Sequence, residues 1–339
     1  MPLGPPVPPP SNGSAMSRRV LGRTGLSISA VGFGCGPTAE LIASGERDAQ
    51  RAAVRRALEL GIDYFDTAPL YGAGESERNL GALLRELRAT PRVATKVALA
   101  DTDCGDIRGA ILRSVEASLE RLAQPRIAVL HLHNRIGVER RPKAELGSGA
   151  LLNVADVLGP RGVAETFATL RAQGVVDYFG CSAYGGDMRA VEEVVASGAF
   201  DCLQVHYSML NTTAWESPPA GSRVRDYRCI GARAAEAGLG IVALRVLEAG
   251  LLAGQAPSAG AAERDGEATA AQRSSLAALL EPEPLIETAL RFALSRPEVT
   301  SVLVGFSNVA QVEAAAAAAA NGALPATVLE RIEAWRASP

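Results

Sequence analysis

Short apolar segments alternate along the chain with longer segments in which apolar residues recur at helical spacing. Each short segment is rich in β-branched or aromatic residues, and a glycine-rich or polar turn separates it from the helical pattern that follows. We count eight such units and expect strands at residues 27–34, 62–67, 92–97, 127–133, 175–182, 201–207, 240–246 and 300–305.

The helical segments carry apolar stripes at i, i+3, i+4 and i+7 or a similar spacing, which is typical of a helix with one buried face. The stripe after the second strand consists of Leu80, Leu83, Leu84 and Leu87. The stripe after the third strand consists of Ile111, Val115, Leu119 and Leu122. The last predicted helix contains seven consecutive alanines, Ala314 to Ala320, and ends at Asn321-Gly322.

Eight alternating strand and helix units predict a parallel sheet closed into a (β/α)₈ TIM barrel, because right-handed crossovers put every helix outside. An open doubly wound sheet is the alternative. It would usually carry G-x-G-x-x-G after its first strand, and Gly32, Gly34 and Gly36 alternate without that spacing. In a barrel, the loops after the strands form the active site. The long loops at this rim are residues 134–160, 207–225 and 247–280.

The N-terminal residues 1–15 differ in composition from the rest of the chain. They are rich in proline and glycine and lack the basic start and apolar core of a signal peptide, so we expect a disordered leader. Alternation of apolar and polar residues begins near Met16 and predicts a short N-terminal β-hairpin. We therefore expect a single barrel domain over residues 16–339.

Composition and charge exclude several partners. The chain is 47% hydrophobic with a net charge of −3 and no basic block, so nucleic acid is not an expected partner. No apolar run approaches the roughly 18 residues of a membrane span, so we expect no membrane partner. The five cysteines form an odd set without a CxxC pair, which favours free thiols in a reducing cytosol and a cytoplasmic protein.

Polar side chains fall at the ends of three neighbouring predicted strands. Asp66 ends the second strand, Lys96 lies at the end of the third and His133 ends the fourth, while Tyr71 follows in a glycine-rich turn. Adjacent strands lie roughly 4.8 Å apart. Lys96 should therefore have Asp66 on one side and His133 on the other, with Tyr71 within reach. His131 shares a face with His133, but only the later residue reaches the rim.

This group is suited to proton transfer. A buried Lys96 needs a counter-charge, which Asp66 supplies, and the remaining positive field favours the phenolate, so we expect the pKa of Tyr71 to fall. Such a phenol can protonate a carbonyl oxygen and take the proton back in reverse, while His133 hydrogen-bonds the same oxygen. None of these groups is a good nucleophile here, which points to hydride transfer from a bound nicotinamide.

A metal site is the alternative interpretation of the histidines. His131, His133 and His206 with a rim acid form a plausible ligand set. This interpretation leaves Tyr71 without a role, and the charge of Lys96 would repel a cation. We therefore expect no metal.

The segment GIDYFDTAPLYGAGESERNLG, residues 61–81, resembles the signature of the aldo-keto reductase family. RVATKV, VLHLHN, FGCSAYG, LQVHYSMLN and VLVGFSNVAQVEAA resemble the later blocks of that family in the right order. The resemblance implies an oxidoreductase that interconverts a small-molecule carbonyl (aldehyde, ketone or sugar lactol/lactone) and an alcohol. Tyr71 would be its general acid/base, and Asp66, Lys96 and His133 the other catalytic residues. The stretch IVALRVLEAGLLAG looks like bacterial members near the sugar 1-dehydrogenase and general aldehyde reductase branches.

The resemblance also implies an extended NADP or NAD across the barrel mouth, with NADP slightly favoured and no Rossmann motif. Ser182 and Gln204 would hydrogen-bond the nicotinamide carboxamide. The adenosine phosphate would lie at Gly305, Ser307 and Gln311.

We add Arg245 to the cofactor residues, because a guanidinium pairs well with the oxygens of a pyrophosphate. Asn308 would cap the helix that begins there.

Several positions depart from the family pattern. Ala183 stands where many members have asparagine, Leu244 where many have an aromatic, and Gly305 and Gln311 where a basic pair commonly binds a 2′-phosphate. These departures leave open a second function class, a nicotinamide-binding regulatory or scaffold protein with little turnover.

Overall fold

The computed structural model describes residues 16–37, 39–142, 149–219, 221–222, 224–255 and 270–337. The expected leader, residues 1–15, and parts of the three expected rim loops lie outside the described residues.

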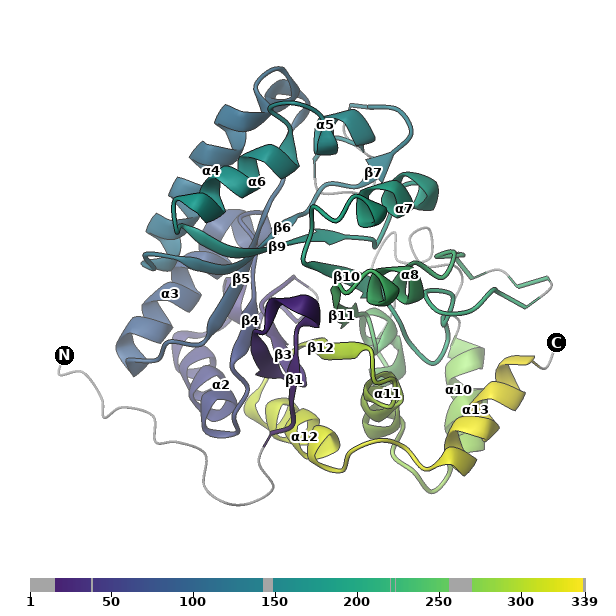
Figure 1. Cartoon of the computed structure of the whole chain (residues 1–339). Coiled ribbons are helices and arrows are strands. Elements are labelled where there is room, and N and C mark those ends of the chain that lie inside the picture. Colours follow the sequence, from purple (N-terminus) through teal and green to yellow (C-terminus); the bar gives the residue numbers. More distant parts are fainter. Residues whose placement is uncertain are drawn as a thin grey trace.

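Within the described chain, eight parallel strands form a closed barrel at the centre of the molecule (Figure 1). The strands, in their order around the barrel, are β3 (Val31–Gly34), β4 (Tyr64–Asp66), β5 (Arg92–Val97), β6 (Ile127–Leu132), β9 (Val176–Ser182), β10 (Cys202–His206), β11 (Gly240–Leu244) and β12 (Val299–Gly305). Closure is direct, because β12 pairs with β3 from Val302↔Val31 to Gly305↔Gly34. The predicted (β/α)₈ barrel is confirmed and the open sheet is excluded.

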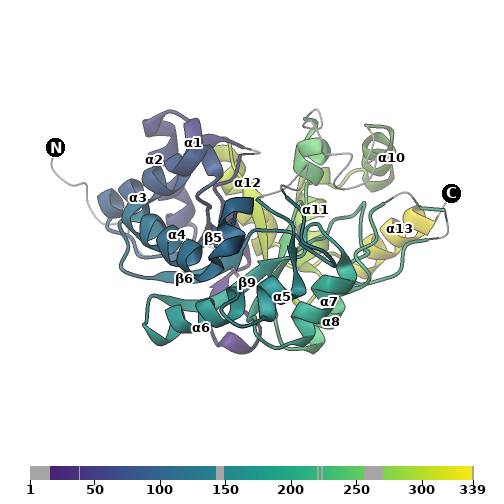
Figure 2. The same cartoon turned by 90° about the horizontal axis from the view of Figure 1, so that it is seen from above.

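Helices surround the barrel on its outer face, as Figure 2 shows from a second direction. They are α1 (Leu41–Ser44), α2 (Arg47–Glu59), α3 (Glu75–Leu87), α4 (Ile107–Leu122), α5 (Val154–Leu158), α6 (Val163–Ala172), α7 (Met188–Ala196), α8 (Ile230–Glu236), α10 (Ala270–Leu280), α11 (Leu285–Leu294), α12 (Val309–Ala320) and α13 (Ala326–Ala337). The predicted leucine stripe of α3 is fully buried. In α4, Leu119 is only partly buried and the other three stripe residues are buried.

The alanine-rich segment forms α12, which ends before Asn321-Gly322 as expected. It is not the last helix, however, because α13 follows it and packs against α10 (Figure 1). The indole nitrogen of Trp335 donates to Ser275 Oγ across this contact at 2.9 Å. Only Val328 and Ile332 of α13 are buried, so its sequence carries a weak apolar period.

The first predicted strand is wrong in its extent. Residues Ser27–Ser29 form β2, which pairs antiparallel with β1 (Arg18–Val20) in the expected N-terminal hairpin, and only β3 belongs to the barrel. The chain changes direction at Ala30. Ser29 holds this corner, because its hydroxyl donates to Val31 O at 2.7 Å and accepts from Asp63 N at 3.1 Å.

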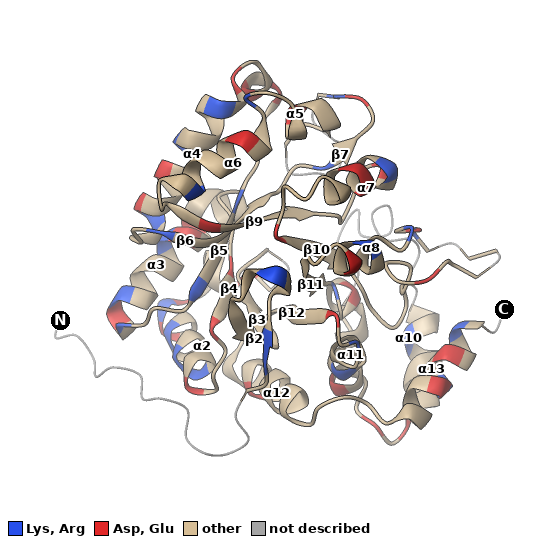
Figure 3. Ribbon diagram, in the orientation of Figure 1, with Lys and Arg blue, Asp and Glu red and all other residues tan. Residues whose placement is uncertain are grey.

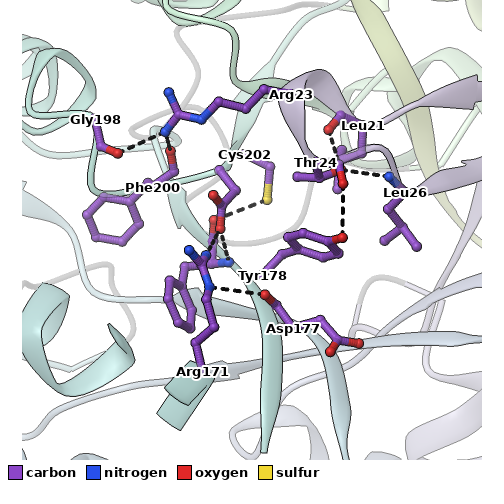
Figure 4. A network of polar contacts seen from close by, with 12 residues as sticks. Leu21, Arg23, Thr24, Leu26, Arg171, Asp177, Tyr178, Gly198, Phe200 and Cys202 are labelled. Atoms are coloured by element: carbon purple, nitrogen blue, oxygen red, sulfur yellow. Dashed lines mark hydrogen bonds and ion pairs between the residues drawn. The ribbon is translucent and has the colours of Figure 1, made fainter. Parts of the chain in front are cut away.

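The hairpin closes the N-terminal end of the barrel, and Figure 4 shows the contacts that fix it there. Leu21 is fully buried and packs against core residues inside this end of the barrel. Arg23 donates to the carbonyl oxygen of Phe200 at 2.8 Å, and the hydroxyl of Tyr178 donates to Thr24 O at 2.9 Å. This closure leaves the opposite end, where the strands terminate, for a functional site.

The long loops at that opposite end carry some regular structure of their own. The loop after β6 contains β7 (Ile136–Gly137) and β8 (Leu152–Asn153), a two-stranded pair. A 3₁₀ segment, Glu248–Ala253, follows β11.

Lys and Arg residues are interspersed with Asp and Glu residues along the outer helices (Figure 3). All five cysteines are free thiols. No helix among the described residues is long and apolar enough to cross a bilayer.

Candidate active site

Tyr71 is presented by a left-handed turn that follows β4. Gly72, Ala73 and Gly74 have φ values of 59°, 52° and 92°, a conformation that glycine adopts readily and that is unfavourable for other residues. A Cβ on Gly72 would also lie 3.1 Å from the Cβ of Ala43. The glycines of the sequence YGAG therefore allow the chain to reverse directly after Tyr71.

Lys96 and Asp66 form a buried ion pair at the ends of β5 and β4. Their exposed fractions are 2% and 1%, and Lys96 Nζ donates to Asp66 Oδ1. The ammonium also donates to Thr67 O at 2.9 Å, and Asp66 Oδ2 accepts from Gln204 Nε2 at 2.7 Å. Each charge thus has hydrogen-bond partners besides the other, which a buried ion pair requires to be tolerated.

The same ammonium lies beside Tyr71, as the strand positions predict. Lys96 Nζ is 4.9 Å from the centroid of the Tyr71 ring. The ring of His133 meets that of Tyr71 edge-on, with centroids 5.8 Å apart and an interplanar angle of 87°. His133 is partly exposed, but its Nδ1 is buried without a hydrogen-bond partner. The structure therefore brings all four predicted rim residues together.

The protonation states of this cluster follow from burial and from one charge. Burial raises the pKa of Tyr71 by more than the neighbouring Lys96 lowers it, so the expected fall in this pKa is wrong for the protein alone. Burial alone would lower the pKa of Lys96, but attraction to Asp66 and Tyr71 outweighs it and the pKa is raised. Burial and the charge of Lys96 hold the pKa of His133 well below its usual value. At neutral pH the cluster is a neutral phenol, an ammonium and a neutral imidazole.

His131 occupies a different place from His133. It pairs in register with Lys96 inside the barrel, is fully buried, and neither ring nitrogen has a hydrogen-bond partner. Burial, with a smaller effect of Lys96, lowers its pKa to about 3. The partly exposed His133 is therefore the histidine that a molecule at the barrel mouth can reach.

A pocket of about 210 Å³ opens at the same end of the barrel as this cluster, over the ends of β11 and β12. Arg245, Gly305, Ser307 and Gln311, four of the six expected cofactor residues, line it. Most of its remaining wall is apolar, and includes Ile286, Leu290, Leu303, Val304, Phe306, Ala314 and Ala315.

The other two expected cofactor residues, Ser182 and Gln204, do not line this pocket. Ser182 ends β9 and pairs in register with Gln204 of β10, and both are buried. Because Gln204 Nε2 donates to Asp66, this side chain also helps to hold the ion pair, a role that sequence reasoning missed.

Arg245 sits just after β11 with a φ of 55°, and its guanidinium lies 4.8 Å from the centroid of the Tyr184 ring. Tyr184 was not among the predicted site residues, because an aromatic in the loop after β9 carries no spacing signal that relates it to β11. Glu248, in the 3₁₀ segment that follows, accepts from His206 Nε2 at 3.0 Å and from the hydroxyl of Ser208.

The start of α12 is capped as predicted. Asn308 Oδ1 accepts from Gln311 N at 3.0 Å, and Gln311 Oε1 accepts from Ser307 N at 2.7 Å. Both acceptors are neutral side chains.

The residues present fit a dinucleotide. The apolar pocket walls suit an adenine ring, and Arg245 supplies a cation for phosphate oxygens. The described residues contain no cluster of three or more histidine, cysteine or acidic side chains placed to hold a metal ion. His206, part of the alternative metal set, is bound to Glu248 and lies 3.3 Å from the Tyr227 hydroxyl.

Comparison with known proteins agrees with this geometry. The chain is 29% identical over 305 residues to the L-galactose dehydrogenase of Arabidopsis thaliana, covering 87% of this chain and 85% of the relative. It is 30% identical over 325 residues to the D-threo-aldose 1-dehydrogenase of a Pseudomonas species, covering 85% and 88%. The holo form of an aldo-keto reductase of Bacillus halodurans superposes with a TM-score of 0.72 at 25% identity, covering 94% of this chain and 96% of that one. Residues 30–337 match the Aldo/keto reductase family, and the chain therefore belongs to this family of oxidoreductases.

Proposed function

We propose that the protein is an NAD(P)(H)-dependent oxidoreductase that interconverts an aldehyde, ketone or sugar lactol/lactone with the corresponding alcohol. One observation carries the proposal: the ring of Tyr71 lies close to both the ammonium of the buried Lys96–Asp66 pair and the ring of the neutral His133, at the end of the barrel where the dinucleotide-sized pocket opens.

The proposed chemistry assigns one task to each side chain. The reduced nicotinamide, when bound, supplies hydride to the carbonyl carbon. Tyr71 donates its proton to the carbonyl oxygen as negative charge develops there, so that the carbonyl becomes an alcohol. Lys96 stabilises the phenolate that remains, and Asp66 fixes the ammonium in place. The neutral imidazole of His133 donates a hydrogen bond to the same oxygen and orients it.

Six residues would hold the dinucleotide. Ser182 and the amide oxygen of Gln204 would bind the carboxamide, Arg245 the pyrophosphate, and Gly305, Ser307 and Gln311 the adenosine end. The relatives named for L-galactose and D-threo-aldose support a sugar lactol as substrate, and the free thiols support a place in the reducing cytosol.

Turnover tests this function directly. Purified protein is incubated with NADH or NADPH and a panel of aldehydes, ketones and aldoses, and cofactor consumption and product are measured in both directions. We expect catalytic consumption with at least one carbonyl class. Saturable cofactor binding without turnover on any substrate would favour the regulatory or scaffold alternative.

The pH profile should identify Tyr71 rather than His133 as the proton donor. The raised pKa of Tyr71 keeps the phenol protonated through pH 6–9, and the strongly lowered pKa of His133 keeps its ring neutral there. We therefore expect kcat/KM for carbonyl reduction to be nearly flat over this range, while alcohol oxidation, which needs the phenolate, rises by up to about tenfold per pH unit. Reduction that declines as pH rises through 7 would instead indicate an imidazolium donor.

Arg245→Ala should weaken binding of both dinucleotides by about tenfold or more, because a charged hydrogen bond to the shared pyrophosphate is lost. Dissociation constants from calorimetry check this. Arg113→Ala, on the exposed face of α4, is the matched control and should leave them unchanged. Unaltered affinity in Arg245→Ala would remove Arg245 from the cofactor site.

A further inference from the structure

We infer that the pocket beside α12 selects the dinucleotide that lacks a 2′-phosphate, so that the protein prefers NAD(H) to NADP(H), and that Ala314 is a position that sets this specificity. The inference rests on the proposed function and concerns the far end of the same cofactor. It contradicts the slight preference for NADP that the family resemblance implies.

The positions of Tyr71 and His133 determine which end of the cofactor occupies the pocket. The nicotinamide must reach the substrate beside Tyr71 and His133, so the adenosine end extends away from them, over β12 and α12. Apolar residues of α11 and β12, Ile286, Leu290 and Leu303, provide a wall for the adenine ring there. A phosphate on the adjacent ribose would then lie at the rim of this pocket, near the first turns of α12.

Cationic partners are scarce at this rim. Among the described residues that line the pocket, Arg245 is the only one with a formal charge. Its guanidinium is stacked on Tyr184, in the loop after β9. The barrel order β9-β10-β11-β12 puts that loop on the side of β11 away from α12. The charge of Arg245 is therefore held toward the middle of the barrel mouth, where both dinucleotides carry their pyrophosphate.

Two backbone donors at the start of α12 are also engaged. The amides of Ser307 and Gln311 donate to the neutral side chains of Gln311 and Asn308, at 2.7 and 3.0 Å. A helix N-terminus attracts phosphate through such amides, and a phosphate bound to these two would have to displace the side chains that cap them.

Arg56, on the nearby helix α2, does not compensate. Its Nε binds Glu313 Oε1 at 2.7 Å, so the charge of this arginine is already paired with an acid of α12. A 2′-phosphate carries nearly two negative charges and loses part of its hydration on binding. Without charged partners, that loss is uncompensated and binding is weakened.

Direct binding tests the inference, with two matched variants. Ala314 and Ala317 are both exposed alanines on α12, but only Ala314 lines the pocket. Calorimetric titration with NADH and with NADPH, without substrate, gives both dissociation constants for the native protein, Ala314→Arg and Ala317→Arg.

We expect the native protein to bind NADH at least about tenfold more tightly than NADPH. Ala314→Arg should tighten NADPH binding by about tenfold and leave NADH nearly unchanged, while Ala317→Arg should alter neither. Equal or tighter binding of NADPH by the native protein would overturn the inference and leave the proposed function intact. Lack of a gain for NADPH in Ala314→Arg would overturn the assignment of this position. Binding of neither dinucleotide would refute the proposed function and this inference together.

Discussion

Replacing Tyr71 with phenylalanine should lower kcat for carbonyl reduction by about 10³-fold and leave the dissociation constant of the dinucleotide nearly unchanged. The substitution removes only the hydroxyl, which is the proton donor of the proposed reaction. The ring stays beside Lys96 and His133, so the packing of the site is retained. Steady-state kinetics and calorimetry on the same preparation measure the two quantities separately.

The control is Tyr178→Phe at the closed end of the barrel. It also deletes one tyrosine hydroxyl, which donates to Thr24 O at 2.9 Å. We expect it to reduce stability by about 1 kcal/mol and to leave kcat unchanged. If Tyr71→Phe lost as much cofactor affinity as turnover, Tyr71 would be a cofactor-binding residue and not the proton donor.

Lys96→Met should abolish measurable turnover and also lower the free energy of unfolding by about 3–5 kcal/mol. The activity falls because the phenolate of Tyr71 loses the charge that stabilises it. The stability falls because Asp66, 1% exposed, is left as a buried carboxylate without its counter-charge. Urea denaturation and kinetics measure the two effects.

A double variant, Lys96→Met with Asp66→Asn, separates these effects. Removing both charges should restore much of the stability and none of the activity. Arg78→Met, which breaks an exposed pair with Glu75 on α3, is the control and should change stability by less than about 1 kcal/mol. If Lys96→Met were no less stable than this control, the buried pair would not be part of the folded core.

The barrel could be predicted from sequence because its signals are local. Leucines such as Leu80 and Leu84 mark the inner face of a helix without reference to any other segment. The first strand was predicted too long because alternation continues through the corner at Ala30, where the hairpin ends and β3 begins. The helix α13 was missed because two buried residues give almost no periodic signal.

The rim cluster was predictable for a different reason. Parallel strands all end at one side of a barrel, so Asp66 and Lys96 had to lie together once their strands were identified. The stacking of Arg245 on Tyr184 could not be foreseen, since it depends on how two loops pack. The pKa of Tyr71 was predicted in the wrong direction, because sequence shows the nearby charge but not the depth of burial that outweighs it.

Hydride transfer itself is the most direct test of the proposed function. The protein is incubated with reduced dinucleotide that carries deuterium at C4 of the nicotinamide, on each face in turn. The second substrate is an aldehyde that the protein consumes or, if none is found, each carbonyl of the panel. We predict that deuterium from one face appears on the carbinol carbon of the product, in step with cofactor oxidation. Bound cofactor that never delivers deuterium to any carbonyl would contradict the account.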